Sequence, residues 1–408
     1  MKQRVRVALV DWNEFAHHQM VFREQCLALL KLGCSVAALC PEPNRLARYL
    51  EASGAGESLK SGDIRCARLC VCRLSLFRPR RWKPAIRAAL LRRDCMRAVR
   101  SLEKDIGRPF DLIFFSTIYD FDVGDLRRIT SALDRPWSGL KLHCAPRYSE
   151  IPGGQPARSN IEMLSLLADP KLRALGTLDE LRAPELEDAI RRPVVVFPDL
   201  TDGTFIPAHP RERELRDFAA GRRLTILTGQ IWQSKGAGIL ARAALDPAAS
   251  GLCFAFIGEI MWEFLSSDEK TILEVAAKRR DTVYFSPKRI EDEATYNAAF
   301  RAADVVFAAF RNFPHSSNTL TKAAVFEKPV LVSNGSLLEQ RVRRYGIGEV
   351  VPEENSHAIV RAIHEITDDY PGWLAKAKPR WKDYHSCHSR EGLHLAMREL
   401  LSRAGLTC

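Results

Sequence analysis

The sequence has no run of about 18 consecutive apolar residues, the length that a membrane-spanning helix needs. It also lacks the features of a secretory leader, because residues 1–10 lead directly into a strand pattern. We therefore expect a cytoplasmic protein without a spanning helix. No base-stacking module or recognition motif accompanies the basic residues, so we expect no nucleic-acid partner.

The chain also lacks the paired cysteines of a zinc ribbon. Its 11 cysteines stand at irregular spacings, and Cys70 and Cys72 have no second pair to complete a site. Cysteines inside apolar runs, such as Cys26, are typical of small buried side chains in a reducing compartment. We predict no metal ion and no cofactor. Residue types that can bind zinc also gather near the C-terminus, but their spacing matches no standard site. We expect them to be exposed polar residues of a helix; they are His385, Cys387, His388 and His394.

The composition is that of a globular enzyme. Apolar residues make up 46% of the chain and charged residues 27%, which excludes a disordered or fibrous class. A chain of 408 residues suits two domains of roughly 150–200 residues each. The formal net charge of +11 favours an anionic ligand, acceptor or surface.

The N-terminal part opens with a strand, a helix and a second strand. Residues 4–10 alternate and are β-branched, and residues 22–32 carry apolar side chains at helical spacing. Gly33 ends this helix, and an apolar strand follows at 35–40. A strand–helix–strand unit within about 40 residues implies a parallel sheet.

The C-terminal part repeats this alternation. Strand patterns at 223–228 and 252–258 flank a helix at 237–245, and a helix at 319–326 precedes a strand at 329–333. We therefore predict an α/β protein with two Rossmann-like doubly wound domains facing a cleft, with ligands bound at the carboxyl ends of the strands. The expected boundaries are a domain over 1–200, a linker over 201–221, a domain over 222–372 and a helical segment over 373–408 that packs back on the first domain.

Two loops of the second domain have the residues of an anion site. Gly229-Gln230-Ile231-Trp232-Gln233-Ser234-Lys235-Gly236 follows a strand and opens a helix, so its backbone and its lysine are placed to reach a diphosphate. Ser316, Ser317, Asn318 and Thr319 precede a second helix, where hydroxyls and free amide groups bind anions. The alternative is that these residues cap their helix and that Lys235 is a solvated surface lysine.

The C-terminal half resembles the donor domain of GT-B glycosyltransferases, in particular the retaining family 4. The family's Gly-Arg-x-x-x-x-Lys-Gly loop corresponds to 229–236, and its Gly-Lys-Pro-Val stretch to Glu327-Lys328-Pro329-Val330. The order of motifs continues with Ala303-Asp304-Val305 and with 346–352. The resemblance implies a nucleotide-sugar donor site at Gly229, Gln230, Lys235, Gly236, Ser316, Ser317, Asn318 and Thr319.

The chain departs from this family at three positions. The family carries two glutamates, the first on the donor sugar and the second on the ribose, where this chain has Pro314 and Lys322. Gln230 replaces the loop arginine. Two interpretations follow: the donor is bound differently, with Lys322 reaching a phosphate, or donor catalysis is lost.

Acceptor-side groups are expected in the first domain, after the first strand. The resemblance implies a histidine there in inverting members, and His18 occupies that spacing relative to Gly33. A histidine near its ordinary pKa serves as a general base, and Asp11 at the strand end would orient it. The alternative is an ordinary helix-start histidine. Weaker candidates are Asp120, Asp122, His143 and Glu259.

The segment 78–104 is dense in arginine, with Trp82 and Leu90 as apolar contrast. One interpretation is a peripheral contact with a membrane surface at the inner face, where lipid-linked acceptors lie. The other is a solvated helix face.

These observations predict a metal-independent, hexosyltransferase-like glycosyltransferase that moves a sugar from a nucleoside-diphosphate sugar to a saccharide or lipid-linked acceptor, in polysaccharide or glycolipid biosynthesis. Lys235 and the helix start at 316–319 would offset charge on the departing diphosphate. Two rivals are a catalytically silent GT-B partner subunit, which the missing glutamates favour, and a nucleotide-sugar 2-epimerase, which needs more carboxylates than this half contains.

Overall fold

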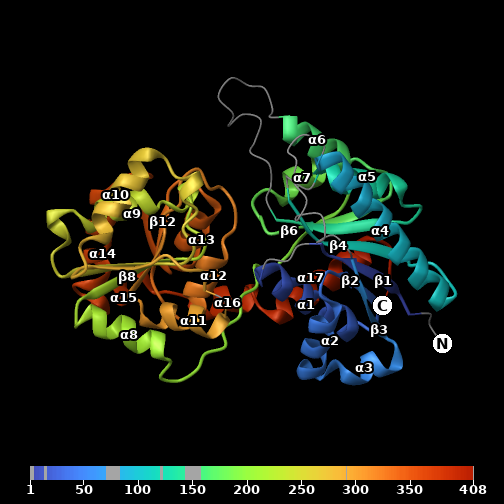
Figure 1. Ribbon diagram of the computed structural model, residues 1–408, viewed down its shortest axis with the longest axis horizontal. Helices are drawn as coiled ribbons and strands as arrows, with labels where there is room; N and C mark the ends of the chain where they lie inside the picture. The colour runs from blue at the N-terminus through green and yellow to red at the C-terminus, as the bar shows by residue number, and fades with distance from the viewer. Residues whose placement is uncertain are drawn as a thin grey trace. The chain divides into compact units, whose positions relative to one another are not determined.

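The computed structural model describes residues 4–12, 16–69, 83–119, 123–142, 158–290 and 292–407, and the side chains of all of these except 16–18, 83–88 and 158–162. The chain divides into two compact units (Figure 1). Unit 1 comprises Met1–Pro198 and Ser389–Cys408, and unit 2 comprises Asp199–His388.

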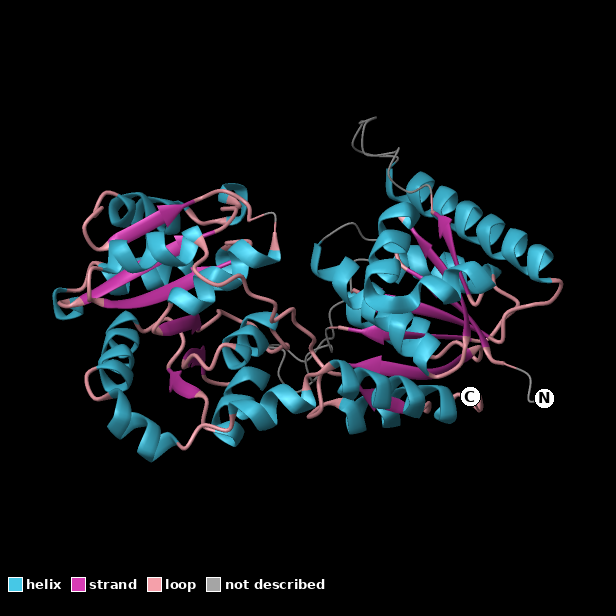
Figure 2. Ribbon diagram, turned by 90° about the horizontal axis from the view of Figure 1, so that it is seen from below, coloured by secondary structure: helices cyan, strands magenta, loops and turns pink. Residues whose placement is uncertain are grey.

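Unit 1 is built on a parallel sheet whose seven described strands have the order β3-β2-β1-β4-β5-β6-β7. Every residue of β1 and β4 is buried, as expected of central strands covered on both faces. The helices lie on both sides of the strands (Figure 2). The strands are β1 Arg6–Val10, β2 Ser35–Cys40, β3 Ile64–Arg68, β4 Leu112–Ile118, β5 Trp137–Lys141, β6 Leu172–Thr177 and β7 Val194–Val196.

The helices of unit 1 include one from the C-terminal end of the chain. This helix, α17, packs against α1, β6 and β7, and the ion pairs Lys31–Glu391 (2.9 Å) and Arg390–Glu24 (2.8 Å) tie it to α1. The helices are α1 Ala16–Lys31, α2 Pro43–Leu50, the π-helical η1 Glu51–Ala55, α3 Gly56–Ser61, α4 Lys83–Ile106, α5 Val123–Ala132, α6 Arg158–Leu167, α7 Ala183–Ile190 and α17 Arg390–Arg403.

Unit 2 holds a parallel sheet of six described strands in the order β10-β9-β8-β11-β12-β13. The strands are β8 Arg223–Thr228, β9 Leu252–Ile257, β10 Val283–Ser286, β11 Val305–Ala308, β12 Val330–Ser333 and β13 Gly348–Val351. The helices are α8 Pro210–Ala219, α9 Ala237–Ala244, α10 Ser267–Ala277, α11 Glu293–Ala302, α12 Asn318–Val325, α13 Leu337–Tyr345, α14 Ser356–Thr367, α15 Tyr370–Ala377 and α16 Trp381–Cys387, with 3-10 turns η5 Gln233–Lys235, η6 Pro247–Ala249 and η7 Trp262–Phe264. The predicted class, two doubly wound α/β domains, is confirmed.

The segment over 201–221 differs from the linker that its polar composition suggests. Residues 210–219 form α8, whose start is capped by the His209 ring, which accepts a hydrogen bond from the Arg211 amide (3.1 Å). Leu215 and Ala219 are buried, and Glu212 pairs with Arg301 of α11 at 2.8 Å. Part of the segment expected as a linker is therefore a short charged helix that packs on unit 2, which needs few apolar residues.

The segment over 373–408 is also divided differently from the expectation, because α15 and α16 belong to unit 2 and only α17 belongs to unit 1. The Trp373 indole donates to Glu349 of β13 at 2.8 Å, which holds α15 on unit 2. His388 and His394 are buried rather than exposed. The His388 Nδ1 accepts from the Asp199 amide at 3.0 Å, and burial lowers the pKa of His388 well below its ordinary value.

Within the described part of the chain, no helix combines the length and hydropathy that crossing a bilayer requires.

Candidate functional site

The loop after β8 is built on two glycines that approach each other closely. Gly229 has φ 99° and Gly258, which follows β9, has φ 137°, both in the left-handed region. A Cβ atom on Gly258 would lie 2.0 Å from the Gly229 carbonyl oxygen. The Ile231 amide donates to the Glu259 carbonyl at 2.8 Å, so the two loops are joined at the carboxyl edge of the sheet. The two loops therefore pack backbone against backbone at this edge, with no side chain between the two glycines.

Lys235 ends the 3-10 turn η5 in this loop, and its ammonium lies 4.1 Å from the centroid of the Phe310 ring. The ammonium has no hydrogen bond or ion pair with any residue that the structure describes. Desolvation lowers the pKa of Lys235 to about 8. Gly236 follows with φ 69°, where a Cβ would lie 2.7 Å from the Ala309 carbonyl oxygen. The loop is thus packed on the chain after β11, and it presents a half-buried cation without an acidic partner.

The start of α12 is engaged inside the protein. Ser317 is its N-cap, and its hydroxyl accepts from the Thr319 amide at 3.3 Å. The Ser316 hydroxyl donates to Asp199 Oδ2 and accepts from Arg341 Nη1, both at 2.6 Å. All of these residues are buried, as is the Thr319 side chain. The expectation that the hydroxyls of Ser316 and Ser317 face an anion therefore differs from their observed partners.

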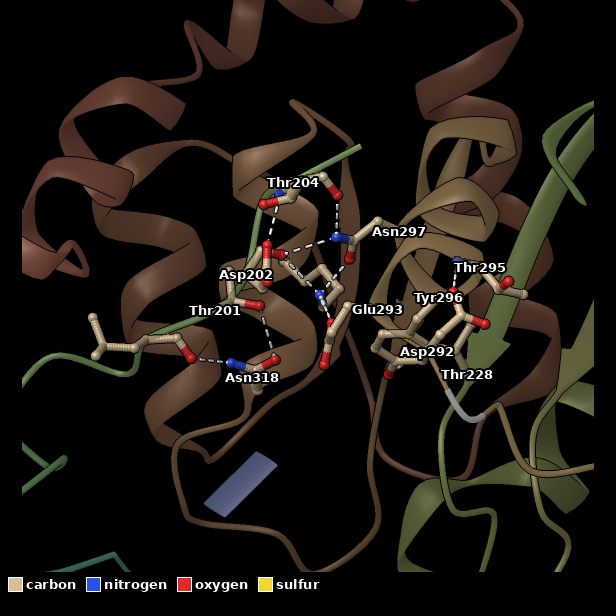
Figure 3. Close-up of polar contacts among 12 residues, drawn as sticks. Thr201, Asp202, Thr204, Thr228, Asp292, Glu293, Thr295, Tyr296, Asn297 and Asn318 are labelled. Atoms are coloured by element: carbon tan, nitrogen blue, oxygen red, sulfur yellow. Dashed lines mark hydrogen bonds and ion pairs between the residues drawn. The ribbon is translucent and has the colours of Figure 1, made fainter. Parts of the chain in front are cut away.

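Asn318 links α12 to the chain that enters unit 2. Its Oδ1 accepts from the Thr201 hydroxyl at 3.1 Å, and its Nδ2 donates to the Leu200 carbonyl. The amide side chain is thus occupied by residues 200–201 (Figure 3). What α12 offers a ligand is therefore its position and its dipole rather than these side-chain groups.

Lys322 lies in the interior, and this differs from the expectation that it reaches a phosphate. Its side chain is 1% exposed, and its Nζ donates to the Asp202 carbonyl (3.0 Å), to Glu293 Oε2 (2.9 Å) and to Asn297 Oδ1 (Figure 3). An ammonium has three N–H donors, and all three are used here. Burial lowers the pKa of Lys322, and the Glu293 carboxylate opposes this shift. The physical reason for the difference is that a buried lysine must be paired.

In unit 1, Asp11 follows β1 and is buried, and its amide donates to the Leu39 carbonyl at 3.0 Å. It lines a small cavity at the ends of β1 and β2, together with Gln19, Arg23 and Cys40 among others. His18 lies in the first turn of α1, and its side chain falls outside the described residues. The backbone thus brings these two positions to the same edge of the sheet. Asp120, Asp122 and His143 lie outside the described residues.

The described part of the basic segment is an amphipathic helix. Leu91, Cys95 and Val99 of α4 face the core. The opposite face is exposed at Arg92, Arg93, Arg97, Arg100, Ser101 and Lys104, and these residues line a groove together with the buried Met96 and with Ala132 of α5. We call this groove the α4 basic face. Residues 78–82 lie outside the described residues.

Three residues of the site are missing from the sequence prediction: Gly258, Phe310 and Glu293. Gly258 carries a signal, since a glycine directly after an apolar strand indicates a close backbone approach. No sequence signal marks Phe310 or Glu293, because each contacts a lysine that is far away along the chain: Phe310 contacts Lys235, and Glu293 contacts Lys322. Glu259, a weaker candidate, accepts a hydrogen bond from the Gln230 side chain at 3.4 Å.

Comparison with solved structures identifies the architecture. HepE of Anabaena, solved in complex with UDP and glucose, superposes with a TM-score of 0.67 over 98% of this chain and 100% of HepE, at 13% sequence identity. Sucrose-phosphate synthase from Thermosynechococcus elongatus gives a TM-score of 0.67 at 17% identity, over 98% and 99% of the two chains. A glycosyltransferase from Rickettsia africae gives 0.61 at 12% identity, over 98% of each chain. The chain has the GT-B fold.

Sequence comparisons are more limited. No protein-family model matches the chain. One curated relative, a 1-deoxy-D-xylulose 5-phosphate reductoisomerase from Solibacter usitatus, is 30% identical over 148 residues, which is 35% of this chain. The match spans about a third (32%) of the relative's length. The GT-B assignment therefore rests on the fold.

Proposed function

We propose that this protein transfers a sugar from a nucleoside-diphosphate sugar to an acceptor hydroxyl, as a member of the family 4 type. The observation that carries the proposal is Lys235, a desolvated cation without an acidic partner among the described residues, at the carboxyl edge of a doubly wound sheet. Ligands of such sheets bind at this edge. The solved structures of similar fold include one with UDP and glucose and one with UDP-glucose, which supports a uridine donor.

In this proposal the diphosphate lies against the glycine loop. The left-handed glycines at 229 and 236 let the loop turn tightly after the strand, and this turn places the Lys235 side chain beside the phosphates. The Lys235 ammonium either leaves the Phe310 ring to bind a phosphate oxygen or contacts the ring and the oxygen at the same time. As the bond from the sugar to the diphosphate breaks, negative charge grows on the phosphate, and a fixed cation in a desolvated site stabilises it.

The acceptor side of the proposal lies in unit 1. Asp11 stands at the end of β1, and His18 lies in the first turn of α1. In an inverting reaction the histidine takes the proton of the acceptor hydroxyl and the aspartate orients the imidazole. In a retaining reaction the departing phosphate takes this proton, and the two residues bind the acceptor.

We also propose that the acceptor is presented at an anionic membrane surface. The support is the α4 basic face, whose arginines are exposed on one side of a helix that is anchored in the core by the other side. Each basic residue near such a surface contributes about 1 kcal/mol of attraction.

A second candidate is a partner subunit that binds the nucleotide without transferring sugar. One observation favours it: Lys322, at a position where the resemblance expects a ligand-binding glutamate, is fully engaged inside the protein. This candidate predicts Lys235-dependent nucleotide binding with no turnover of any nucleotide sugar.

The decisive experiment is thermal unfolding of the purified protein with UDP, GDP, ADP, dTDP and CDP, beside the Lys235→Ala variant. A matched control is Lys278→Ala, which removes an exposed lysine at the end of α10. A base-selective rise in Tm that is lost in Lys235→Ala and kept in Lys278→Ala supports the donor site. The absence of a rise with every nucleotide overturns it.

A further inference from the structure

Glu293 is the first residue of α11 and belongs to the same edge of the sheet as the glycine loop. The helix follows β10, and its N-cap Asp292 accepts from the Thr295 amide at 2.8 Å. The Gly258 amide donates to the Ser286 carbonyl at the end of β10 at 3.0 Å, which joins this end to the glycine pair. The carboxylate of Glu293 thus stands where ligands of a doubly wound domain bind.

The ion pair between Glu293 and Lys322 is asymmetric in its exposure. The Lys322 side chain is 1% exposed, whereas the Glu293 side chain is 43% exposed. The ammonium is held from within by the Asp202 carbonyl and Asn297 Oδ1, so it is a fixed point. The carboxylate is anchored through one oxygen, Oε2, at 2.9 Å from the ammonium. An ionised carboxylate has about four acceptor sites on its two oxygens, so it has capacity for further donors.

The face of α11 that carries Glu293 borders the glycine loop. Tyr296 lies one turn further on this face, and its hydroxyl is 3.2 Å from the Thr228 hydroxyl. The same hydroxyl would lie 3.4 Å from a Cβ atom on Gly229. Figure 3 shows Glu293 next to Tyr296 on α11, with Glu293 on the side of Asp202 and Tyr296 on the side of Thr228. The start of α11, which carries Glu293, therefore lies at the same carboxyl edge of the sheet as the loop that carries Lys235.

We propose that Glu293 accepts hydrogen bonds from the vicinal hydroxyls of the donor's ribose, with Lys322 as its positioning residue. A carboxylate accepts two hydroxyl donors of a diol at once, and such bonds are charge-assisted. Acidic residues at the strand ends of doubly wound domains recognise ribose in this way. The resemblance expects a glutamate at position 322 for the ribose; here position 322 carries the cation, and the acid comes from the neighbouring helix. This assignment rests on the proposed function.

The test is the ratio of the Kd for 2′-deoxy-UDP to the Kd for UDP, measured by calorimetry. We expect a ratio of about ten in the wild type, because a hydrogen bond to a charged group contributes about a factor of ten or more. In Glu293→Gln the ratio falls toward one, because UDP, which donates through both hydroxyls, loses more affinity than 2′-deoxy-UDP, which donates through the 3′-hydroxyl alone. The control Asp281→Asn removes one exposed acid before β10 and keeps the wild-type ratio.

The outcomes separate this inference from the donor site itself. Lys235→Ala lowers the affinity for UDP and for 2′-deoxy-UDP equally and leaves the ratio of their Kd values unchanged, because this lysine contacts the phosphates. If the wild type binds UDP through Lys235 with a ratio of one, or if Glu293→Gln keeps a ratio of ten, the ribose assignment is overturned and the donor site stands. If the wild type binds neither nucleotide, both are overturned.

Discussion

The Lys235 ammonium lies 4.1 Å from the centroid of the Phe310 ring, and this aromatic contact stands where an ion pair would be expected. The ring faces the cation with its negative π-surface and contributes about 0.5–2 kcal/mol of attraction in a desolvated place. A carboxylate there would neutralise the lysine and repel a diphosphate. The aromatic partner keeps the lysine in place and leaves its charge for a ligand.

This contact predicts how nucleotide binding depends on pH. Desolvation lowers the pKa of Lys235 to about 8, so the ammonium loses its proton above that pH in the free protein. UDP binds the charged form, so we expect its affinity to fall about twofold between pH 7 and 8 and to approach a tenfold loss per pH unit above pH 8. Calorimetric titration of UDP from pH 7 to 9.5 measures this. The affinity of Lys235→Ala should be weak and flat, and a flat wild-type profile would show that this lysine is not in contact with the phosphates.

A second prediction concerns the close approach of Gly258 and Gly229. The Cβ atom of Gly258→Ala would lie 2.0 Å from the Gly229 carbonyl oxygen, a distance too short for two non-bonded atoms, so the loop has to move. We expect a loss of about 1–3 kcal/mol in the free energy of unfolding, together with weaker UDP binding.

The matched control is Gly251→Ala. Gly251 also has a positive φ (77°), but nothing lies within 4 Å of its Cβ direction. It should cost only the backbone strain, about 1 kcal/mol, and leave UDP affinity unchanged. Urea unfolding of both variants separates the two effects, and equal losses would mean that the contact with Gly229 is unimportant.

A third prediction distinguishes structural from ligand-binding hydroxyls at α12. Ser316 bridges Asp199 and Arg341, so Ser316→Ala leaves buried polar groups unsatisfied and should cost about 1–3 kcal/mol of stability. Ser317→Ala removes only a helix cap, at about 1 kcal/mol. Denaturant unfolding checks this order. Unchanged stability with a loss of UDP affinity in Ser316→Ala would instead place this hydroxyl on the phosphates.

A fourth prediction tests the α4 basic face. Arg97→Glu combined with Arg100→Glu should abolish cosedimentation with vesicles of phosphatidylcholine and phosphatidylserine, because reversing two charges turns attraction into repulsion. The control pair, Arg48→Glu with Lys60→Glu, changes the charge equally on exposed positions of α2 and α3. Raising the salt to 1 M should release the wild type. If the two double variants bind the vesicles equally well, the α4 basic face is a solvated helix face and does not contact a membrane.

A fifth prediction concerns the acceptor side. Asp11→Asn and His18→Gln should each lower the rate of sugar transfer by about 100-fold or more in an inverting reaction, without changing UDP affinity. Single-turnover rates with UDP-glucose, read together with the anomeric configuration of the product, provide the measurement. A retained configuration with an unchanged rate in both variants would remove these residues from proton transfer.

The sequence by itself determined the two doubly wound domains and the glycine loop with its lysine. Apolar strands alternating with amphipathic helices are local patterns, and so is a Gly-x-x-x-x-x-Lys-Gly stretch between a strand and a helix. Even the departures from the family, Gln230, Pro314 and Lys322, were visible as residue types.

Only the tertiary structure decided what those residues touch. Lys322 meets Glu293, 29 residues away, and the carbonyl of Asp202, 120 residues away. The lysine that was predicted to reach a phosphate is thus engaged in an ion pair in the interior. Ser316 meets Asp199 across 117 residues, so the hydroxyl predicted to bind an anion takes part in a bridge between Asp199 and Arg341. The reason is physical: a buried charge or hydroxyl must be paired, and its partner is chosen by which chain segments the fold packs together rather than by its neighbours in the sequence.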